Sequence, residues 1–178
     1  ILSPILIESC VRNIQQTESV ALHIPEIVLG KNYFSRVRRF ERSFYDGTPI
    51  DGARFFHRSI FLNVGGFDES LFIKGSGEDW DIDKLVKQYG TISLLPHYFN
   101  SLIKKTWKMQ DFIETRGVNH AQKFTGIYHN ESEFELWPYL KKKAYYSLGF
   151  DGYINKWGVD DPDIQKQFGL VYRFWTVF

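Results

Sequence analysis

Hydrophobic positions in the first part of the chain follow helical spacing in two places, with one short apolar run between them. A serine and a proline at positions 3 and 4 are typical of a helix start, because serine caps free N–H groups and proline fits the first helical position. Residues 19–24 are almost continuously apolar and end at Pro25, which predicts a buried strand. Residues 33–45 place aromatic residues on one helical face and three arginines on others. We therefore expect a second helix there, whose arginines lie in solvent or meet phosphate.

The middle of the chain alternates between turns, one helical segment and short strand-like runs. The strand-like runs are residues 53–56, 91–95 and 127–129. Between the first two lie a tight Gly-Gly-Phe-Asp turn at residues 65–68 and a helix that begins in the acidic segment 78–81 and stops at Gly90. Residues 97–125 show no clear period, so we expect helix and loop there without obvious chemistry.

The last quarter of the chain has a helical pattern. Residues 133–157 carry apolar side chains at helical spacing, and residues 160–163 form a new helix start of acids around a proline. Helices and short strands alternate along the whole chain, which indicates the α/β class.

Composition supports a globular protein and removes several classes of partner. The 178 residues are 43% apolar and 24% charged, which is typical of a chain with a packed core. The net charge of +1 provides no strong field, so we expect no nucleic-acid partner. Cys10 is the only cysteine, which rules out an internal disulfide and a cysteine-rich zinc site and fits a reducing compartment.

Neither end of the chain carries a recognisable targeting signal. No segment approaches the roughly 20 apolar residues that a membrane-spanning helix needs, and no signal peptide is visible. The first residue is Ile1 and the only methionine is Met109, so we expect this sequence to be a piece of a longer protein. We expect a cytoplasmic location.

The strongest candidate for chemistry is the acidic segment Glu78-Asp79-Trp80-Asp81. Acids at a helix start complement the helix dipole and cap free N–H groups, which is a purely structural explanation. However, a cap needs one acid rather than three, and the segment follows flexible glycines that permit a ligand to approach closely. Both the structural and the functional interpretation stay open from these residues alone.

A second segment upstream makes the pattern specific. Val64-Gly-Gly-Phe-Asp-Glu69 followed by Gly77-Glu-Asp-Trp-Asp-Ile82 resembles the acceptor-side signature of family 2 glycosyltransferases with the GT-A fold. Weaker similarities occur at Ile1-Leu-Ser-Pro4, Ala53-Arg-Phe-Phe56, Ile127-Tyr-His-Asn-Glu131 and Leu140-Lys-Lys-Lys-Ala-Tyr-Tyr146. The resemblance covers roughly residues 1–157, in the order and spacing that the family shows.

The resemblance implies a partial GT-A, Rossmann-like domain with a mixed, incomplete sheet and a helical C-terminal segment. Residues 1–132 would form the acceptor-side half of that domain, and residues 133–178 a C-terminal helical extension. The nucleotide-binding half, with the metal-binding Asp-x-Asp motif, would precede Ile1, so this piece alone should be inactive. Because a GT-A sheet takes its first strands from that half, we expect few strands, with helices packed mainly on one side.

The resemblance also assigns roles around the acceptor. A sugar hydroxyl is a poor nucleophile, so a nearby carboxylate must accept its proton, and Asp79 would be this general base in an inverting transfer. Glu78 would hold acceptor hydroxyls, Trp80 would offer a ring face to the sugar, and Gly66 and Arg54 would complete the acceptor site. Arg54 could organise this site by pairing with a carboxylate.

His129 would face the donor side of the same cleft as Asp79. The leaving diphosphate gathers negative charge, which a divalent metal neutralises, and the resemblance implies Mn²⁺ or Mg²⁺ with His129 as one ligand. Asn130 and Glu131 are candidates to hold the other ring nitrogen. We expect no metal bound to this piece alone, because its ligand set would be incomplete.

The resemblance implies a nucleotide-sugar donor and a glycan, lipid or other hydroxyl acceptor as partners. It is also compatible with peripheral membrane association of the longer protein.

Two other classes of function compete with this interpretation. A non-catalytic carbohydrate-binding module would use the aromatic side chains as platforms and the acids to bind hydroxyls. A glycoside hydrolase would need two carboxylates that face each other across a bond, and the sequence nominates no second one opposite Asp79.

Overall fold

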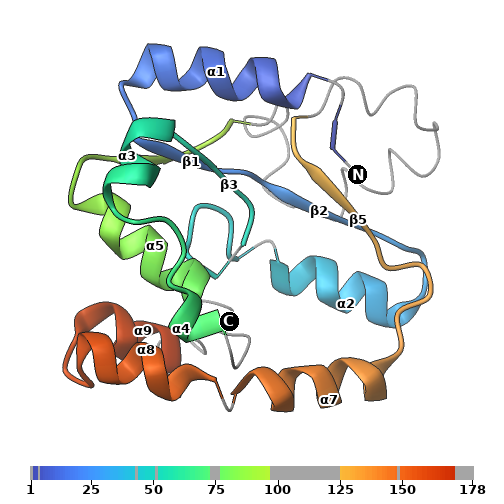
Figure 1. The fold of residues 1–178 in the computed structure, drawn as a ribbon. Helices are drawn as coiled ribbons and strands as arrows, with labels where there is room; N and C mark the ends of the chain where they lie inside the picture. Colours follow the sequence, from blue (N-terminus) through green and yellow to red (C-terminus); the bar gives the residue numbers. More distant parts are fainter. Residues whose placement is uncertain are drawn as a thin grey trace.

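The structure is a computed structural model, and its elements form a mixed α/β arrangement, as expected (Figure 1). The residues that it describes are 2–3, 5–42, 44–50, 52–72, 77–96, 125–147 and 149–170. The helices are α1 (Leu6–Thr17), α2 (Tyr33–Arg42), α3 (Arg58–Asn63), α4 (Glu69–Phe72), α5 (Glu78–Lys87), α7 (Leu136–Ser147), α8 (Phe150–Trp157) and α9 (Pro162–Phe168). The strands are β1 (Ala21–His23), β2 (Glu26–Leu29), β3 (Arg54–Phe56), β4 (Ile92–Leu94) and β5 (Ile127–Asn130).

The strands form two small sheets that meet at Pro25. The first sheet has the order β3-β1-β4, in which β1 is antiparallel to β3 and parallel to β4. The second sheet pairs β2 with β5 in parallel. Proline has no N–H to donate, so Pro25 ends β1, and the chain continues as β2 in the other sheet. Its carbonyl still accepts a hydrogen bond from the backbone N–H of Ile127, which keeps β5 in register with β2.

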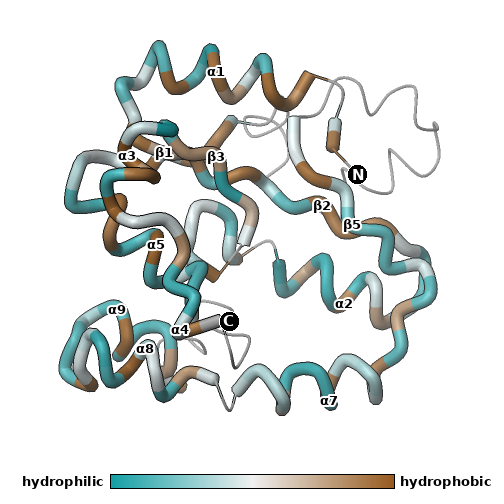
Figure 2. Tube along the Cα trace, viewed as in Figure 1, coloured by the Kyte–Doolittle hydropathy of each residue, from teal (hydrophilic) through white to brown (hydrophobic). Residues whose placement is uncertain are grey.

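The three-stranded sheet is covered on both faces, so the expected one-sided packing is wrong. Successive strand residues point to opposite faces. Leu22 packs in a cluster with Leu6 and Cys10 of α1, whereas Ala21 packs in another with Ile82 and Val86 of α5. Figure 2 shows hydrophobic segments of the sheet between these two helices. The sheet is nevertheless small and mixed, as the sequence predicted.

Helix α2 forms where expected but buries the face that the pattern assigned to solvent. The buried residues of this helix are Ser35, Arg38 and Arg39, while Val37 and Phe40 are exposed. The Arg39 guanidinium donates to the backbone carbonyl oxygens of residues 28 and 30, at 3.2 and 2.6 Å. The end of β2 therefore provides hydrogen-bond acceptors that make a buried arginine favourable.

Several element boundaries differ from the prediction. Helix α3 after β3 and strand β2 after Pro25 were not predicted. The single helix expected at residues 133–157 is divided into α7 and α8, with the break next to Gly149. The helix start at residues 160–163 is confirmed, because the Asp161 side chain accepts from two N–H groups at the start of α9. Residues 97–124, where helix and loop were expected, lie outside the described residues.

Helices α8 and α9 pack against α5 through an aromatic cluster. Trp80 of α5 stacks on Phe150, with ring centroids 4.7 Å apart, and meets Tyr153 edge-on at 5.8 Å. Ile164 of α9 joins the same buried cluster. The C-terminal helices therefore fix the helix that carries the acidic segment.

Candidate functional site

A cleft with a volume of about 770 Å³ lies between the start of α5, helices α2, α7 and α8, and strands β2 and β5. Charged and aromatic side chains make up most of its wall. The lining residues are Glu26, Arg38, Glu41, Arg42, Tyr45, Ile50, Gly52, Gly77, Glu78, Asp79, Trp80, His129, Lys143, Tyr146, Ser147, Phe150, Asp151, Ile154 and Phe168. The expectation that Asp79 and His129 face one cleft is confirmed.

The acidic segment is divided by the geometry of α5. The helix begins at Glu78, directly after Gly77, whose φ of 105° is a left-handed conformation that favours glycine. Asp79 is 44% exposed and lines the cleft, and Glu78 lines it as well. Asp81 has an exposed fraction of 0% and points away from solvent. Only two of the three acids are therefore available to a ligand.

Asp81 has a structural role that connects the two signature segments. Lys156 of α8 donates from its Nζ to Asp81 Oδ2 at 2.8 Å and to Asp68 Oδ2 at 2.9 Å. Trp157 donates from Nε1 to the other Asp81 oxygen at 2.7 Å. The Gly-Gly-Phe-Asp turn and the acidic segment are thus joined through one lysine on a third element.

Burial of the Asp79 carboxylate raises its pKa above that of a free aspartate. Arg54 Nη1 lies 3.6 Å from Asp79 Oδ1. Desolvation by the surrounding protein raises the pKa of Asp79; Arg54 opposes this rise, and the negative charge of Glu78 adds to it. A carboxylate with a raised pKa accepts a proton more readily than one in free solution.

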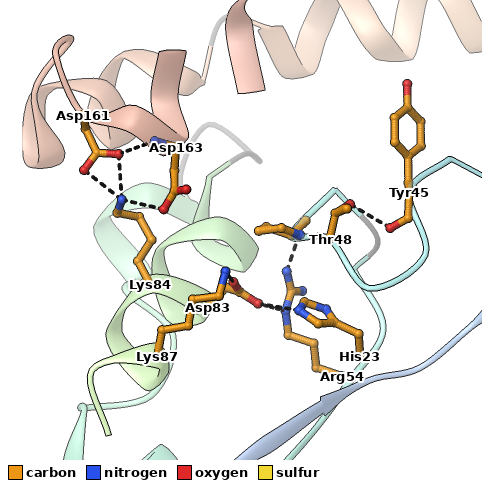
Figure 3. A network of polar contacts seen from close by, with 10 residues as sticks. His23, Tyr45, Thr48, Arg54, Asp83, Lys84, Lys87, Asp161 and Asp163 are labelled. Carbon is orange, nitrogen blue, oxygen red and sulfur yellow. Dashed lines mark hydrogen bonds and ion pairs between the residues drawn. The ribbon is translucent and has the colours of Figure 1, made fainter. Parts of the chain in front are cut away.

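Arg54 lies beneath the cleft and holds several groups at once. Its side chain is 2% exposed, and its Nε lies 3.1 Å from Oδ1 of Asp83, as Figure 3 shows. The guanidinium also donates to the carbonyl oxygens of Gly52 at 3.0 Å and Pro49 at 2.9 Å. The expected pairing of Arg54 with a carboxylate is confirmed. Its contacts to the protein leave it little surface for an acceptor.

His129 pairs with an acid that the sequence did not nominate. Its Nε2 lies 3.3 Å from Oε2 of Glu26, and Arg42 approaches the same oxygen at 3.0 Å. Of the two partners expected for this histidine, Asn130 accepts from Ser132. The other, Glu131, lies 3.5 Å from Arg38. Glu26 was missed because it stands alone after Pro25, in a strand that the pattern did not predict.

The donor set around His129 does not by itself form a metal centre. Among the residues that the structure describes, no group of three or more His, Cys, Asp or Glu side chains could hold a metal ion. His129 and Glu26 would supply two ligands, and Arg42 competes for the carboxylate. A divalent metal at this position would need ligands from elsewhere, and its presence stays a prediction.

Two residues assigned to the acceptor lie less favourably than expected. Trp80 is 9% exposed, and one of its ring faces is occupied by Phe150, so it presents little free surface to a sugar. Gly66 lies in the turn between α3 and α4, under the Phe61 ring, and is not one of the described residues that line the cleft. Tyr45, Tyr146 and the exposed part of Phe150 are the aromatic groups that a ligand could meet instead.

The chain matches no protein-family model, no curated protein and no solved structure. Within the described part of the chain, no helix combines the length and the apolar character needed to cross a membrane. The cleft and the side chains that line it are therefore the structural basis for a function.

Proposed function

We propose that this protein is part of a glycosyltransferase that moves a sugar from a nucleotide-sugar to an acceptor hydroxyl, with Asp79 as the general base. The observation that carries the proposal is the shared cleft, in which a carboxylate of raised pKa and a histidine beside an acid line one cavity. The resemblance of the two signature segments to family 2 glycosyltransferases supports the same assignment.

The proposed step is a single displacement at the anomeric carbon of the donor. The acceptor oxygen forms a bond to that carbon, while the bond from the carbon to the phosphate oxygen breaks and its electron pair leaves with the nucleoside diphosphate. The hydroxyl proton passes to Asp79. Because the acceptor oxygen attacks the face opposite the leaving group, the single displacement inverts the configuration at the anomeric carbon. Glu78, next to Asp79 at the rim, would bind the acceptor hydroxyls.

The polar side chains at the far side of the cleft fit the donor end of this step. His129, Arg42 and Lys143 line the cavity there, and a charged leaving group gains from such a polar, partly enclosed wall. A Mn²⁺ or Mg²⁺ ion would supply further charge neutralisation when bound. The acceptor would be a glycan, a lipid or another hydroxyl compound.

A carbohydrate-binding module without catalysis is the second candidate. The observation in its favour is the aromatic part of the wall, which includes Tyr45, Tyr146 and Phe150 and could stack on sugar rings. Such a module would bind sugars through Glu78 and Asp79 but would release no nucleoside diphosphate.

The test uses the protein encoded by the complete reading frame and a panel of UDP-, GDP- and dTDP-sugars with simple glycoside acceptors. We expect release of nucleoside diphosphate that depends on an acceptor. Asp79→Asn should lower the turnover by about a hundredfold or more, while the affinity for the nucleotide-sugar changes little. The matched control is Asp160→Asn, because Asp160 is an exposed acid that is not among the described residues lining the cleft.

Three outcomes distinguish the candidates. Normal turnover in Asp79→Asn would remove Asp79 as the base. Sugar binding without release of nucleoside diphosphate from any donor would favour the binding module. Release of free sugar from aryl glycosides would instead indicate a hydrolase, whose second carboxylate would be sought among Glu26, Glu41 and Asp151 of the cleft.

A further inference from the structure

A chain of buried polar groups runs from the core of the three-stranded sheet to the cleft. It begins at His23 of β1, passes through Asp83 of α5 and Arg54 of β3, and ends at Asp79 (Figure 3 shows the first three). Asp83 has an exposed fraction of 0%, and no motif or spacing in the sequence singles it out. A fully buried carboxylate is costly unless it is paired, so its position requires an explanation.

The partners of Asp83 are divided between its two oxygens. Oδ1 lies 3.1 Å from Arg54 Nε and 3.2 Å from His23 Nε2. Oδ2 lies 2.9 Å from the Lys87 ammonium group, one helical turn further along α5. Because burial lowers the pKa of His23 to about 4, the histidine is neutral at neutral pH, and Asp83 is balanced by Arg54 and Lys87 alone.

Arg54 can reach Asp79 because its other groups are already held. With Nε directed at Asp83, its two terminal nitrogens reach the carbonyl oxygens of Gly52 and Pro49, and Nη1 also lies 3.6 Å from Asp79. The planar guanidinium has a fixed fork geometry, so fixing one edge fixes the other. Gly52 is close enough that an added Cβ would lie 3.1 Å from Asp79 Oδ2.

We propose that Asp83 is a positioning residue for Asp79, which acts by holding the Arg54 guanidinium in the orientation that reaches the Asp79 carboxylate and the carbonyl oxygens of Pro49 and Gly52. The proposal rests on the proposed function only in calling Asp79 a base. It deepens that function by naming a residue, outside the cleft lining, on which the strength of the base depends.

Loss of the Asp83 charge and loss of the Arg54 position predict opposite effects on Asp79. Four charged groups act on the Asp79 carboxylate: Arg54, which lowers its pKa, and Glu78, Glu26 and Asp83, which raise it. If Arg54 kept its position, removing the negative charge of Asp83 would lower the pKa of Asp79. If Arg54 instead loses its anchor and no longer reaches Asp79, that pKa rises. Removing the positive charge of Arg54 leaves Asp79 among like charges, so its pKa rises further.

The experiment is a carbon-detected NMR titration of the Asp79 side-chain carboxyl in the 178-residue chain. We expect Asp83→Leu, which removes both the charge and the hydrogen-bond acceptor that hold Arg54, to raise the pKa of Asp79, and Arg54→Met to raise it as well. The matched control is Lys87→Gln, which removes a partner of the other Asp83 oxygen without touching Arg54, and should leave the Asp79 titration unchanged. General loosening of the fold would shift the Asp79 pKa in Lys87→Gln too.

Each possible result decides the proposal. An unchanged or lowered pKa of Asp79 in Asp83→Leu would overturn it, because a lowered pKa is what loss of the Asp83 charge alone produces. If either variant does not fold, Arg54→Lys provides the test, because one ammonium group cannot reach Asp83 and Asp79 together. In that variant we expect the pKa of Asp79 to rise, and an unchanged value would overturn the proposal. Absence of sugar transfer would disprove the proposed function but would leave these shifts in place.

Discussion

At the scale of single residues, neighbouring acids of one motif have separate tasks. Asp79 and Asp81 are two positions apart on α5, which places them on nearly opposite sides of the helix at about 100° per residue. Asp79 lines the cleft, whereas Asp81 accepts hydrogen bonds from Lys156 and Trp157 of α8. A cluster of three acids therefore does not imply three functional carboxylates.

His23 should make the stability of the protein depend on pH. Burial lowers its pKa from 6.5 to about 4, so the unfolded chain binds a proton before the folded protein does as the pH falls. Above pH 6.5 the neutral His23 therefore costs no stability. As the pH falls from 6.5 towards 4, His23 lowers the free energy of unfolding by an amount on the order of 3 kcal/mol. Urea unfolding at several pH values measures this loss.

The controls for this pH dependence are two glutamine variants. His23→Gln should remove the loss between pH 6.5 and 4, although it also lowers the stability at neutral pH. His57→Gln should leave it in place, because the His57 side chain is exposed and its ring hydrogen-bonds to the Ser59 hydroxyl. An equally steep loss in wild type and His23→Gln would mean that other groups cause it.

At the scale of elements, two glycines in left-handed conformations should respond differently to alanine. Gly77 precedes α5 with a φ of 105°, and a Cβ there would lie 2.8 Å from Tyr153 Cβ. Gly65 has a φ of 89° but nothing within 4 Å of an added Cβ. We expect Gly65→Ala to cost about 1 kcal/mol from backbone strain alone. Gly77→Ala should cost about 3 kcal/mol or more, because overpacking adds to the strain.

Chemical denaturation of the two variants measures this difference. Because Gly77 lines the cleft directly before Glu78 and Asp79, its alanine variant should also shift the NMR signals of those side chains, whereas Gly65→Ala should not. Equal losses of stability in the two variants would show that Tyr153 of α8 moves aside for the added Cβ at little cost in free energy.

The elements themselves were predictable where local pattern and turn residues agree. The strand before Pro25, the helix that stops near Gly90 and the start of α9 follow from capping and apolar spacing. The buried face of α2 did not follow, because Arg39 is satisfied by backbone carbonyls of β2 that lie about ten residues earlier. Strand β2 was missed because its start, Glu26, is a charged residue directly after a proline.

The site was predictable only in its local part. The acidic segment nominated Glu78 and Asp79, the family resemblance nominated His129, and the structure brings all three to one cleft. Glu26, Asp83 and Lys156 could not be nominated, because each has a decisive partner far away in the sequence. The pairing of β2 with β5 shows what Glu26 contacts, and the packing of α5 against β1, β3 and α8 shows what Asp83 and Lys156 contact.

At the scale of the whole molecule, the C-terminal helices should be necessary for the rest to fold. A chain ending at Ser147 would lack the partners of Asp81 and the rings that cover Trp80. Each large apolar side chain that returns to water costs about 1.5–3 kcal/mol, so loss of this packing removes a large part of the roughly 5–15 kcal/mol that stabilises a typical domain. We expect this shortened chain to lose cooperative thermal unfolding, which circular dichroism measures.

A pair of point variants separates this effect from simple shortening. Lys156→Ala should lower the free energy of unfolding by about 1–3 kcal/mol, because Asp81 loses one of its partners. Lys142→Ala, on the exposed face of α7, should change it by less than about 0.5 kcal/mol. If the shortened chain unfolds as cooperatively as the 178-residue chain, α8 and α9 are not needed for the rest of the chain to fold.

The long sequence separation between Asp81 and its partners also bears on how the protein is made. Lys156 and Trp157 are synthesised 75 and 76 residues after Asp81. At a ribosomal rate of about 5–20 residues per second, roughly 4–15 s pass before α8 can pair with Asp81 and cover Trp80. During that interval the Trp80 side of α5 lacks its aromatic partners, so the nascent chain should expose apolar surface and be a substrate for chaperones until α8 leaves the ribosome.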